Sequence, residues 1–486
     1  MHKLQALKQY FGFSSFRDGQ ENLIDSILEG HDVLGIMPTG AGKSICFQLP
    51  ALMFQGITLV VSPLISLMKD QVHSLTQSGI KAAYLNSSLS KGQYQKALRN
   101  AINSEYKLIY IAPERLFTYE IMQFAKGANI SMVTIDEAHC ISQWGQDFRP
   151  SYLKIYDFTH ELPQRPIISA FTATATRQVR DDIIEKLNLK NPFVLTTGFN
   201  RENLFFSVKK PRNKLSSLKE YIADNAEKTG IIYCLTRKTT EDVCRELAVE
   251  GYSVTRFHAG LTNEEKNRNQ DLFVRDERTI MVATNAFGMG IDKSNISYVI
   301  HYNMPGSIES YYQEAGRAGR DGTPADCILL YGQKDVQTNK FLIEKAGYKE
   351  TAQENIQRNL ELLNKIIFYC KSAKCLRSYI LNYFGEGAAS FCGNCSYCKK
   401  FMQKRKIQHI SDMELFQKLK LLRAMFAASQ KVPAYVIFSD ATLKDMCDKL
   451  PTNSTEFLRI SGVGDNKLEK YGDPFIKVVK DHVNQM

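Results

Sequence analysis

The chain has 486 residues and a mass of 55.2 kDa, which at roughly 100–200 residues per domain predicts about three or four domains. Its composition, 44% hydrophobic and 23% charged, is that of a folded enzyme and excludes disordered and fibrous proteins. The formal net charge of +11 suits a polyanionic partner, although many other proteins reach this value.

The sequence shows neither a membrane span nor a signal peptide. A span needs roughly 18 consecutive apolar residues, and the longest candidate, 57–68, is interrupted by Ser62, Pro63 and Ser66. Lys3 and Lys8 stand where a signal peptide carries its apolar core. We therefore expect a cytoplasmic protein with no membrane partner, whose eleven cysteines do not form disulfides.

Short β-branched or aromatic runs alternate with helical stretches from residue 30 to about residue 335. This alternation predicts βαβ units and buried parallel sheets. The series is too long for one sheet and divides at the polar segment 200–212. We expect two α/β lobes, 1–208 and 209–343, with strands at 32–37, 58–62, 108–112, 132–135, 167–171, 231–235, 279–283, 298–302 and 328–331.

The last third of the chain has a different pattern. After Gly347 the strand signal gives way to helical periodicity that ends in a cluster of cysteines. We predict a cysteine-containing module over 344–400, a basic linker over 401–411 and a small all-helical domain over 412–486.

The first predicted strand runs directly into MPTGAGKS, followed by a helical pattern. Gly40 and Gly42 lack a Cβ, so backbone N–H groups can approach a phosphate, and the helix N-terminus adds its dipole. We expect Lys43 to reach the β- and γ-phosphates of a nucleotide and Ser44 to hold Mg²⁺. The generic pattern has glycine where Met37 stands, so the motif alone also fits a glycine-rich turn.

Two further segments complete a predicted ATPase site. SMVTIDEAH places Asp136 and Glu137 after an apolar strand, where they could hold Mg²⁺ and activate water. SIESYYQEAGRAGRDG places Gln313, Arg317 and Arg320 on one face of a helix expected to begin at Ser307, where an arginine could act as a finger. Each segment alone also fits a solvated strand end or a basic helix end.

The motifs follow one another as in a known family. FGFSSFRDGQ, MPTGAGKS, VVSPLISLMKDQV, YIAPERL, DEAHCISQWGQDFRP, FTATAT, FHAGL, VATNAFGMGIDK and YYQEAGRAGRDG occur in the order found in RecQ-type DNA helicases of superfamily 2. Over residues 1 to about 400 the chain resembles a RecQ helicase, which implies two RecA-like lobes and the cofactors ATP and Mg²⁺. Met37 matches this family, whereas Ala41 replaces a residue that is often glycine in relatives.

The resemblance assigns roles to single residues. It implies that adenine is bound by Phe13, Arg17 and Gln20, and that Thr39 belongs to the phosphate loop. Asp292 falls in the motif between nucleotide and DNA across the cleft. The family also agrees with Arg320 as the finger, supported by Arg317.

Trp144 is the only tryptophan of the chain. A single tryptophan is usually buried in a core, but this one has polar and glycine neighbours and could stack on a base. The resemblance places Trp144, Phe148 and Arg149 in the family's aromatic-rich loop, which couples single-stranded DNA to ATP hydrolysis. We therefore expect these three residues to bind DNA.

The clustered cysteines predict a metal site. Cys392, Cys395 and Cys398 form a C-x₂-C-x₂-C run with Cys375 upstream, and four thiolates suit a closed tetrahedral Zn²⁺ site. The same run also opens the ferredoxin iron–sulfur pattern, but the further Cys-Pro is missing here. We favour zinc, with Cys370 as a non-ligand, and the segment between the ligands resembles the RecQ zinc-binding helical hairpin.

The resemblance changes after the cysteines. Many RecQ proteins continue with a winged-helix domain of about a hundred residues, whereas here only the basic linker precedes a segment that looks like a helicase-and-RNase-D C-terminal (HRDC) domain. We interpret the chain as a bacterial short form without the winged helix. Duplex affinity and unwinding efficiency are the properties that this difference affects.

The resemblance implies ATP-dependent unwinding of duplex DNA with 3′-to-5′ polarity, in DNA repair and recombination. Two other hypotheses are an RNA helicase and a nucleic-acid annealing factor in which hydrolysis only controls release. The expected partners are single-stranded and duplex DNA, with a single-strand-binding protein or other repair factors. We expect a monomer at the bacterial nucleoid.

Overall fold

The computed structural model describes residues 2–484 except 87, 146, 289–292, 347–351 and 431–432, and it also leaves out the side chains of 66, 346, 352–353, 404–412 and 435. The chain divides into two compact units, Met1–Tyr397 and Cys398–Met486. None of the helices in the described part of the chain combines the length and apolar character needed to span a membrane.

The first lobe contains a seven-stranded parallel sheet in the order β3-β4-β2-β5-β6-β1-β7. Its inner strands are buried along their whole length or nearly so, as expected for a parallel sheet covered on both faces. The strands are β1 (Val33–Ile36), β2 (Ile57–Val61), β3 (Ala82–Leu85), β4 (Leu108–Ile111), β5 (Ile130–Ile135), β6 (Ile167–Thr172) and β7 (Phe193–Thr196).

The second lobe contains a six-stranded parallel sheet in the order β10-β11-β9-β12-β13-β8. Numbered from the first strand of each lobe, this is the strand order of the first sheet without β7. The strands are β8 (Leu204–Lys209), β9 (Gly230–Tyr233), β10 (Val254–Phe257), β11 (Ile280–Ala283), β12 (Tyr298–His301) and β13 (Ala325–Leu330). Two α/β lobes of the same topology confirm the predicted fold class.

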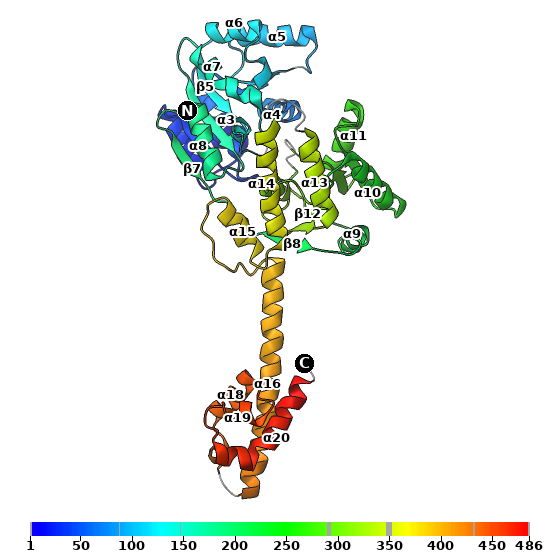
Figure 1. Cartoon of the computed structure of the whole chain (residues 1–486). Coiled ribbons are helices and arrows are strands. Elements are labelled where there is room, and N and C mark those ends of the chain that lie inside the picture. Colours follow the sequence, from blue (N-terminus) through cyan, green and yellow to red (C-terminus); the bar gives the residue numbers. More distant parts are fainter. Residues whose placement is uncertain are drawn as a thin grey trace. The chain divides into compact units, whose positions relative to one another are not determined.

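Helices follow the strands in both lobes (Figure 1). The first lobe has α1 (Lys3–Ala6), α2 (Gln20–Leu28), α3 (Lys43–Met53), α4 (Ile65–Gln77), α5 (Lys91–Ile102), α6 (Tyr119–Gly127), α7 (Lys154–His160) and α8 (Arg177–Lys186). The second lobe has α9 (Lys214–Ala223), α10 (Arg237–Val249), α11 (Asn263–Val274) and α12 (Ile308–Ala315). Helices α13 (Gln333–Ala346), α14 (Ala352–Lys371) and α15 (Leu376–Tyr383) form the region around the cysteines.

The second unit is all-helical, coloured orange to red in Figure 1. Helix α16 (Ser396–Gln430) enters it and is followed by α17 (Ala434–Ile437), α18 (Asp440–Lys449), α19 (Ser454–Phe457) and α20 (Asp465–Val483). Its core contains Leu415, Leu419, Phe438, Phe457 and Phe475, each inaccessible to solvent. The segment has its own hydrophobic core and therefore the organisation of a separate domain.

Two expectations about the connections differ from the structure. The predicted divide at 200–212 contains β8, whose pairing with β13 places it in the second sheet, so the predicted boundary after residue 208 falls inside a strand of the second lobe. The predicted linker 401–411 has helical backbone within α16. Four strands were not predicted from the sequence: β3, β7, β10 and β8, the last of which lies in the segment that was interpreted as the divide.

Candidate nucleotide and zinc sites

The phosphate loop joins β1 to α3. Gly40 and Gly42 have φ values of +87° and +83°, a left-handed conformation that favours glycine. Gly42 is the residue before α3 and has no side chain that could cap the helix. The first N–H groups of α3 therefore receive no hydrogen bond from the side chain of the N-cap residue. The Lys43 ammonium donates a hydrogen bond to the Met37 carbonyl at 3.2 Å. The loop thus combines close backbone, a helix N-terminus and a cation.

Two of the three residues expected to bind adenine contact the phosphate loop. Gln20 is buried and donates to the carbonyls of Ala41 and Gly42 at 3.2 and 3.1 Å, while Arg17 donates to the Gly40 carbonyl. Phe13, 47% exposed, lies at the pocket wall. Gln20 and Arg17 therefore hold the loop in its shape in this structure.

The acidic pair follows β5. Asp136 accepts a 2.9 Å hydrogen bond from the Glu137 backbone N–H, and Glu137 adopts a left-handed conformation with φ +48°. Such backbone in a non-glycine residue is uncommon and costs of order 1–3 kcal/mol, a cost found most often at functional sites. The Oε2 atom of Glu137 lies 3.3 Å from Nδ1 of the buried His139.

The surroundings of Asp136 and Glu137 shift the pKa values of these two carboxyl groups in opposite directions. Burial and the adjacent Glu137 raise the pKa of Asp136 to about 7. Burial opposes the ionisation of Glu137 too, but His139 and Lys43 outweigh it and lower the pKa of this carboxyl to about 2. Glu137 is therefore held as a carboxylate, the form that can accept a proton from water.

The arginines lie beyond the helix on which they were predicted. Ser307 caps α12 as expected, with its side chain accepting from the Ser310 N–H, but the helix ends at Ala315. Gly316 follows as the cap, so Arg317 and Arg320 lie in turns and do not share a helix face with Gln313. Gln313 and Arg317 are buried, at 8% and 3% exposure.

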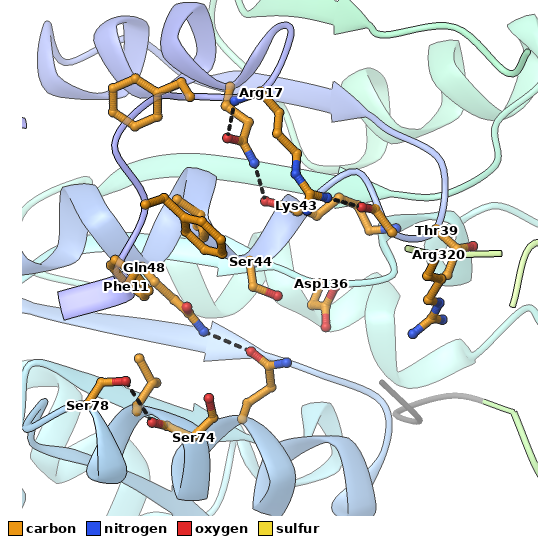
Figure 2. Close-up of a pocket in the computed structure, with 18 of the residues that line it drawn as sticks. Phe11, Arg17, Thr39, Lys43, Ser44, Gln48, Ser74, Ser78, Asp136 and Arg320 are labelled. Carbon is orange, nitrogen blue, oxygen red and sulfur yellow. Dashed lines mark hydrogen bonds between the residues drawn. The ribbon is translucent and has the colours of Figure 1, made fainter. Parts of the chain in front are cut away.

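One pocket of about 760 Å³ brings the predicted nucleotide residues together (Figure 2). From the first lobe it is lined by Phe13, Arg17, Gln20, Thr39, Gly40, Gly42, Lys43, Ser44, Asp136 and Glu137. From the second lobe Arg320 lines the same pocket, and a methyl group added at Gly40 would lie 3.4 Å from Arg320 Cγ. Gln313 and Arg317 do not line it, and Asp292 lies outside the described residues.

The loop after the acidic pair carries the predicted DNA-binding residues. Trp144, Phe148 and Arg149 are all half-buried. Arg149 donates to the Pro63 carbonyl at 2.7 Å and contacts the Asp147 carboxylate at 3.0 Å. Gly145 packs on the His139 carbonyl, which a methyl group there would approach to 2.2 Å. The loop is therefore built directly onto the residue that contacts Glu137.

The four predicted zinc ligands lie together. The Sγ atoms of Cys375, Cys392, Cys395 and Cys398 are all within 4.8 Å of one another, and those of Cys375 and Cys395 are 3.9 Å apart. Tetrahedral Zn²⁺ with Zn–S bonds of about 2.3 Å needs sulfur atoms about 3.8 Å apart. Burial and the neighbouring thiols raise the pKa of Cys392, so a bound cation would favour the ionised form of this thiol. The cluster fits zinc.

The sequence analysis missed two residues of the ATPase site. His139 connects Glu137 to Thr172, whose hydroxyl lies 2.9 Å from His139 Nδ1 and donates to the Thr174 carbonyl. His139 ends SMVTIDEAH, in which only Asp136 and Glu137 were given a role, and Thr172 lies in FTATAT, which was identified only as a mark of a family. Their contact joins the ends of neighbouring strands, which the sequence does not reveal without the sheet order.

Comparisons with known proteins agree with this geometry. Models of four families match the chain: DEAD/DEAH box helicase at 17–182, helicase conserved C-terminal domain at 213–322, RecQ zinc-binding at 333–399 and HRDC domain at 412–479. The ATP-dependent DNA helicase RecQ of Bacillus subtilis is 38% identical, with 99% of each chain covered. The chain belongs to the RecQ family. Its counterpart in Haemophilus influenzae is 35% identical, covering 99% of this chain and 96% of that one.

The RecQ relatives are longer than this chain. The alignment with the Bacillus subtilis protein runs over 587 positions, so at least 101 of them hold no residue of this 486-residue chain. Between the zinc-binding and HRDC matches only residues 400–411 remain. This interval is too short for a domain of about a hundred residues, the size expected of a winged helix.

Solved structures share the fold at low identity. Dbp5 of S. cerevisiae bound to RNA and ADP BeF3 has a TM-score of 0.57 at 18% identity, covering 75% of this chain and 97% of that chain. Mycobacterium smegmatis helicase Lhr bound to ssDNA and AMP-PNP has a TM-score of 0.56 at 17% identity, covering 75% and 57%. These likenesses show the two-lobed fold.

Proposed function

We propose that this RecQ-family chain hydrolyses ATP with Mg²⁺ and uses the reaction to unwind duplex DNA with 3′-to-5′ polarity, in DNA repair and recombination. The observation that carries the proposal is that Arg320 from one lobe lines the same pocket as Lys43, Ser44 and Asp136 from the other. A pocket shared by two lobes allows ATP binding and hydrolysis to alternate closure with opening.

The residues of this pocket divide the chemistry among themselves. Lys43 and the backbone of Thr39, Gly40 and Gly42 would bind the phosphates, while Ser44 and Asp136 would hold Mg²⁺, which neutralises phosphate charge when bound. Glu137 would take the proton of the attacking water. Arg320 would stabilise the negative charge that develops on the γ-phosphate. Gln313 and Arg317, which are buried and do not line the pocket, would support it.

The DNA contacts belong to the loop of Trp144, Phe148 and Arg149. This loop follows the 3₁₀ helix Ala138–Ile141, which contains His139, so a base stacked on Trp144 would act on the contacts that hold Glu137. Stacking of a base on an aromatic side chain contributes about 1–3 kcal/mol. We propose that strand binding at this loop stimulates hydrolysis.

Strand-displacement assays test the proposal. Duplexes with a 3′ or a 5′ single-stranded tail are incubated with Mg²⁺-ATP and the chain or its Lys43→Ala variant. We expect release from the 3′-tailed duplex only, and none by the variant. ATP turnover without strand release would instead support a translocase or an annealing factor, and equal release of RNA strands would support an RNA helicase.

The surroundings in which the protein acts are also proposed. DNA as partner and zinc as structural metal agree with its family, and we propose that it acts as a monomer at the bacterial nucleoid. Light scattering of the purified chain with and without tailed DNA measures its oligomeric state, and a dimer in either sample would contradict the monomer.

A further inference from the structure

Residues 198–204, which lead from the first sheet into the first residue of β8, are here called the connecting segment. Its Arg201 side chain reaches both sides of the nucleotide pocket. One terminal nitrogen donates to the Thr39 carbonyl of the phosphate loop and to the Gly316 carbonyl, each at 3.3 Å. The other donates to the carbonyls of Ala318 and Gly319 at 3.0 and 2.6 Å.

Residues 316–323 form the turn that carries Arg317 and Arg320, here called the arginine turn. Two residues of the connecting segment bind this turn. Besides Arg201, Asn203 donates to the carbonyls of Gly319 and Thr323 at 2.8 and 2.9 Å. Gly319 has φ +56°, and a methyl group there would lie 2.4 Å from the Asn203 amide nitrogen. The fit leaves no space for another residue type.

The zinc-binding region, residues 333–399, forms hydrogen bonds with the connecting segment. Arg377, 5% exposed, donates to the Asn200 side chain at 3.1 Å and to the backbone carbonyls of Arg201, Glu202 and Leu204. Asn394 donates to the Glu202 carbonyl at 3.0 Å, and Glu386 accepts from the Phe199 N–H at 2.5 Å.

The metal ligands adjoin these gripping residues. Cys375 caps α15, which begins one residue before Arg377, and Asn394 stands between Cys392 and Cys395. Ligation of the four thiolates would thus fix the start of α15 and the backbone of Asn394.

We propose that Arg201 is a positioning residue for ATP hydrolysis and that the zinc-binding region controls its placement through the connecting segment. The region fixes the backbone on which Arg201 stands, and Arg201 fixes the arginine turn against the phosphate loop. This inference rests on the proposed ATPase activity. It assigns the zinc-binding region a part in catalysis that is separate from any contact with DNA.

The first test is Arg201→Lys, which keeps the charge but cannot make the forked contact to four carbonyls. We expect kcat for ATP at saturating single-stranded DNA to fall about tenfold, with the KM for ATP changed by less than about twofold, because the binding groups remain while their alignment is lost. Arg245→Lys is the matched control, since Arg245 is an exposed arginine of α10 paired with Asp242. Its kcat should equal that of the unmodified chain.

The second test concerns the zinc-binding region. Asn394→Ala removes one hydrogen bond to the connecting segment and spares the cysteines. We expect kcat to fall about threefold, a loss of alignment smaller than that in Arg201→Lys, with zinc content and melting temperature unchanged.

The outcomes separate the two proposals. An unmodified chain without ATPase activity would contradict the proposed function itself. An active unmodified chain with an unchanged kcat in Arg201→Lys, or with a loss confined to KM, would overturn the positioning role. An unchanged kcat in Asn394→Ala would overturn the control by the zinc-binding region.

Discussion

The two lobes have the same strand order and use the ends of their strands differently. In the first lobe, the helix after the first strand, α3, starts at Lys43, and the residue before it, Gly42, provides no side-chain cap. In the second lobe, the corresponding helix α9 is capped by Asn213, whose side-chain oxygen accepts from the N–H groups of Leu215 and Ser216 at 2.9 and 3.2 Å. The second lobe thus satisfies internally the donors that the first lobe offers to a phosphate.

The fifth strands differ in the same sense. In the first lobe β5 is followed by Asp136 and Glu137, whereas in the second β12 is followed by Tyr302 and Asn303. Asn303 accepts from the Leu235 N–H at 3.1 Å and donates to Asp335 at 2.9 Å. The comparison teaches that this topology supplies a nucleotide site only where glycines and carboxylates replace the residues that close the strand ends.

The largest expected effect is that of Glu137→Gln. Removal of a positioned base typically costs 10²–10⁴ in rate, so we expect kcat to fall about 10³-fold while ATP binding persists. Steady-state turnover and binding of a fluorescent ATP analogue measure the two quantities. Asn303→Ala, at the corresponding place of the second lobe, should keep ATP turnover. Comparable losses of turnover in both variants would contradict the statement that only the first lobe uses the end of its fifth strand for the reaction.

Gly42→Ala tests the uncapped helix start. The added methyl group would lie 2.4 Å from the Gln20 amide nitrogen in a left-handed conformation. We expect ATP affinity to fall about tenfold, because the loop must shift away from the geometry that presents its N–H groups. Gly251→Ala, in the second lobe, has φ +84° with nothing within 4 Å, so it carries the same backbone strain without the contact. Equal affinities in the two variants would contradict the role of the loop.

Trp144→Ala tests the coupling of DNA to the first lobe. We expect basal ATP turnover to remain and its stimulation by single-stranded DNA to fall about tenfold, in line with the 1–3 kcal/mol of a stacked base. Tyr119→Ala removes an exposed aromatic side chain elsewhere in the same lobe and serves as the control. Stimulation that survives the loss of Trp144 would remove this loop from the proposed mechanism.

The smallest expected effect is that of Asn213→Ala. Loss of a helix cap costs about 1 kcal/mol, so the free energy of unfolding of the second lobe should fall by that amount with ATP turnover unchanged. Urea denaturation followed by circular dichroism measures the loss. A fall in turnover comparable to that of Gly42→Ala would show that the two helix starts are not used differently.

The sequence by itself determined the features that are contiguous in the chain. The phosphate loop, the Asp136–Glu137 pair and the cysteine run are each written within a few residues, because their chemistry needs fixed spacing along one loop or turn. The alternation of strands and helices predicted the two α/β lobes because each βαβ unit is formed by segments that follow one another in the chain. Strands without the pattern of a buried run were missed, among them β7, whose two end residues are exposed.

Only the tertiary structure decided how distant segments meet. Arg320 faces Gly40 because the two lobes share one pocket, and His139 meets Thr172 because β5 and β6 are neighbours. The reach of Arg201 between two loops depends on carbonyl groups brought close by folding. Hydrogen bonds of this kind act over about 3 Å in space and leave no periodic trace in the sequence.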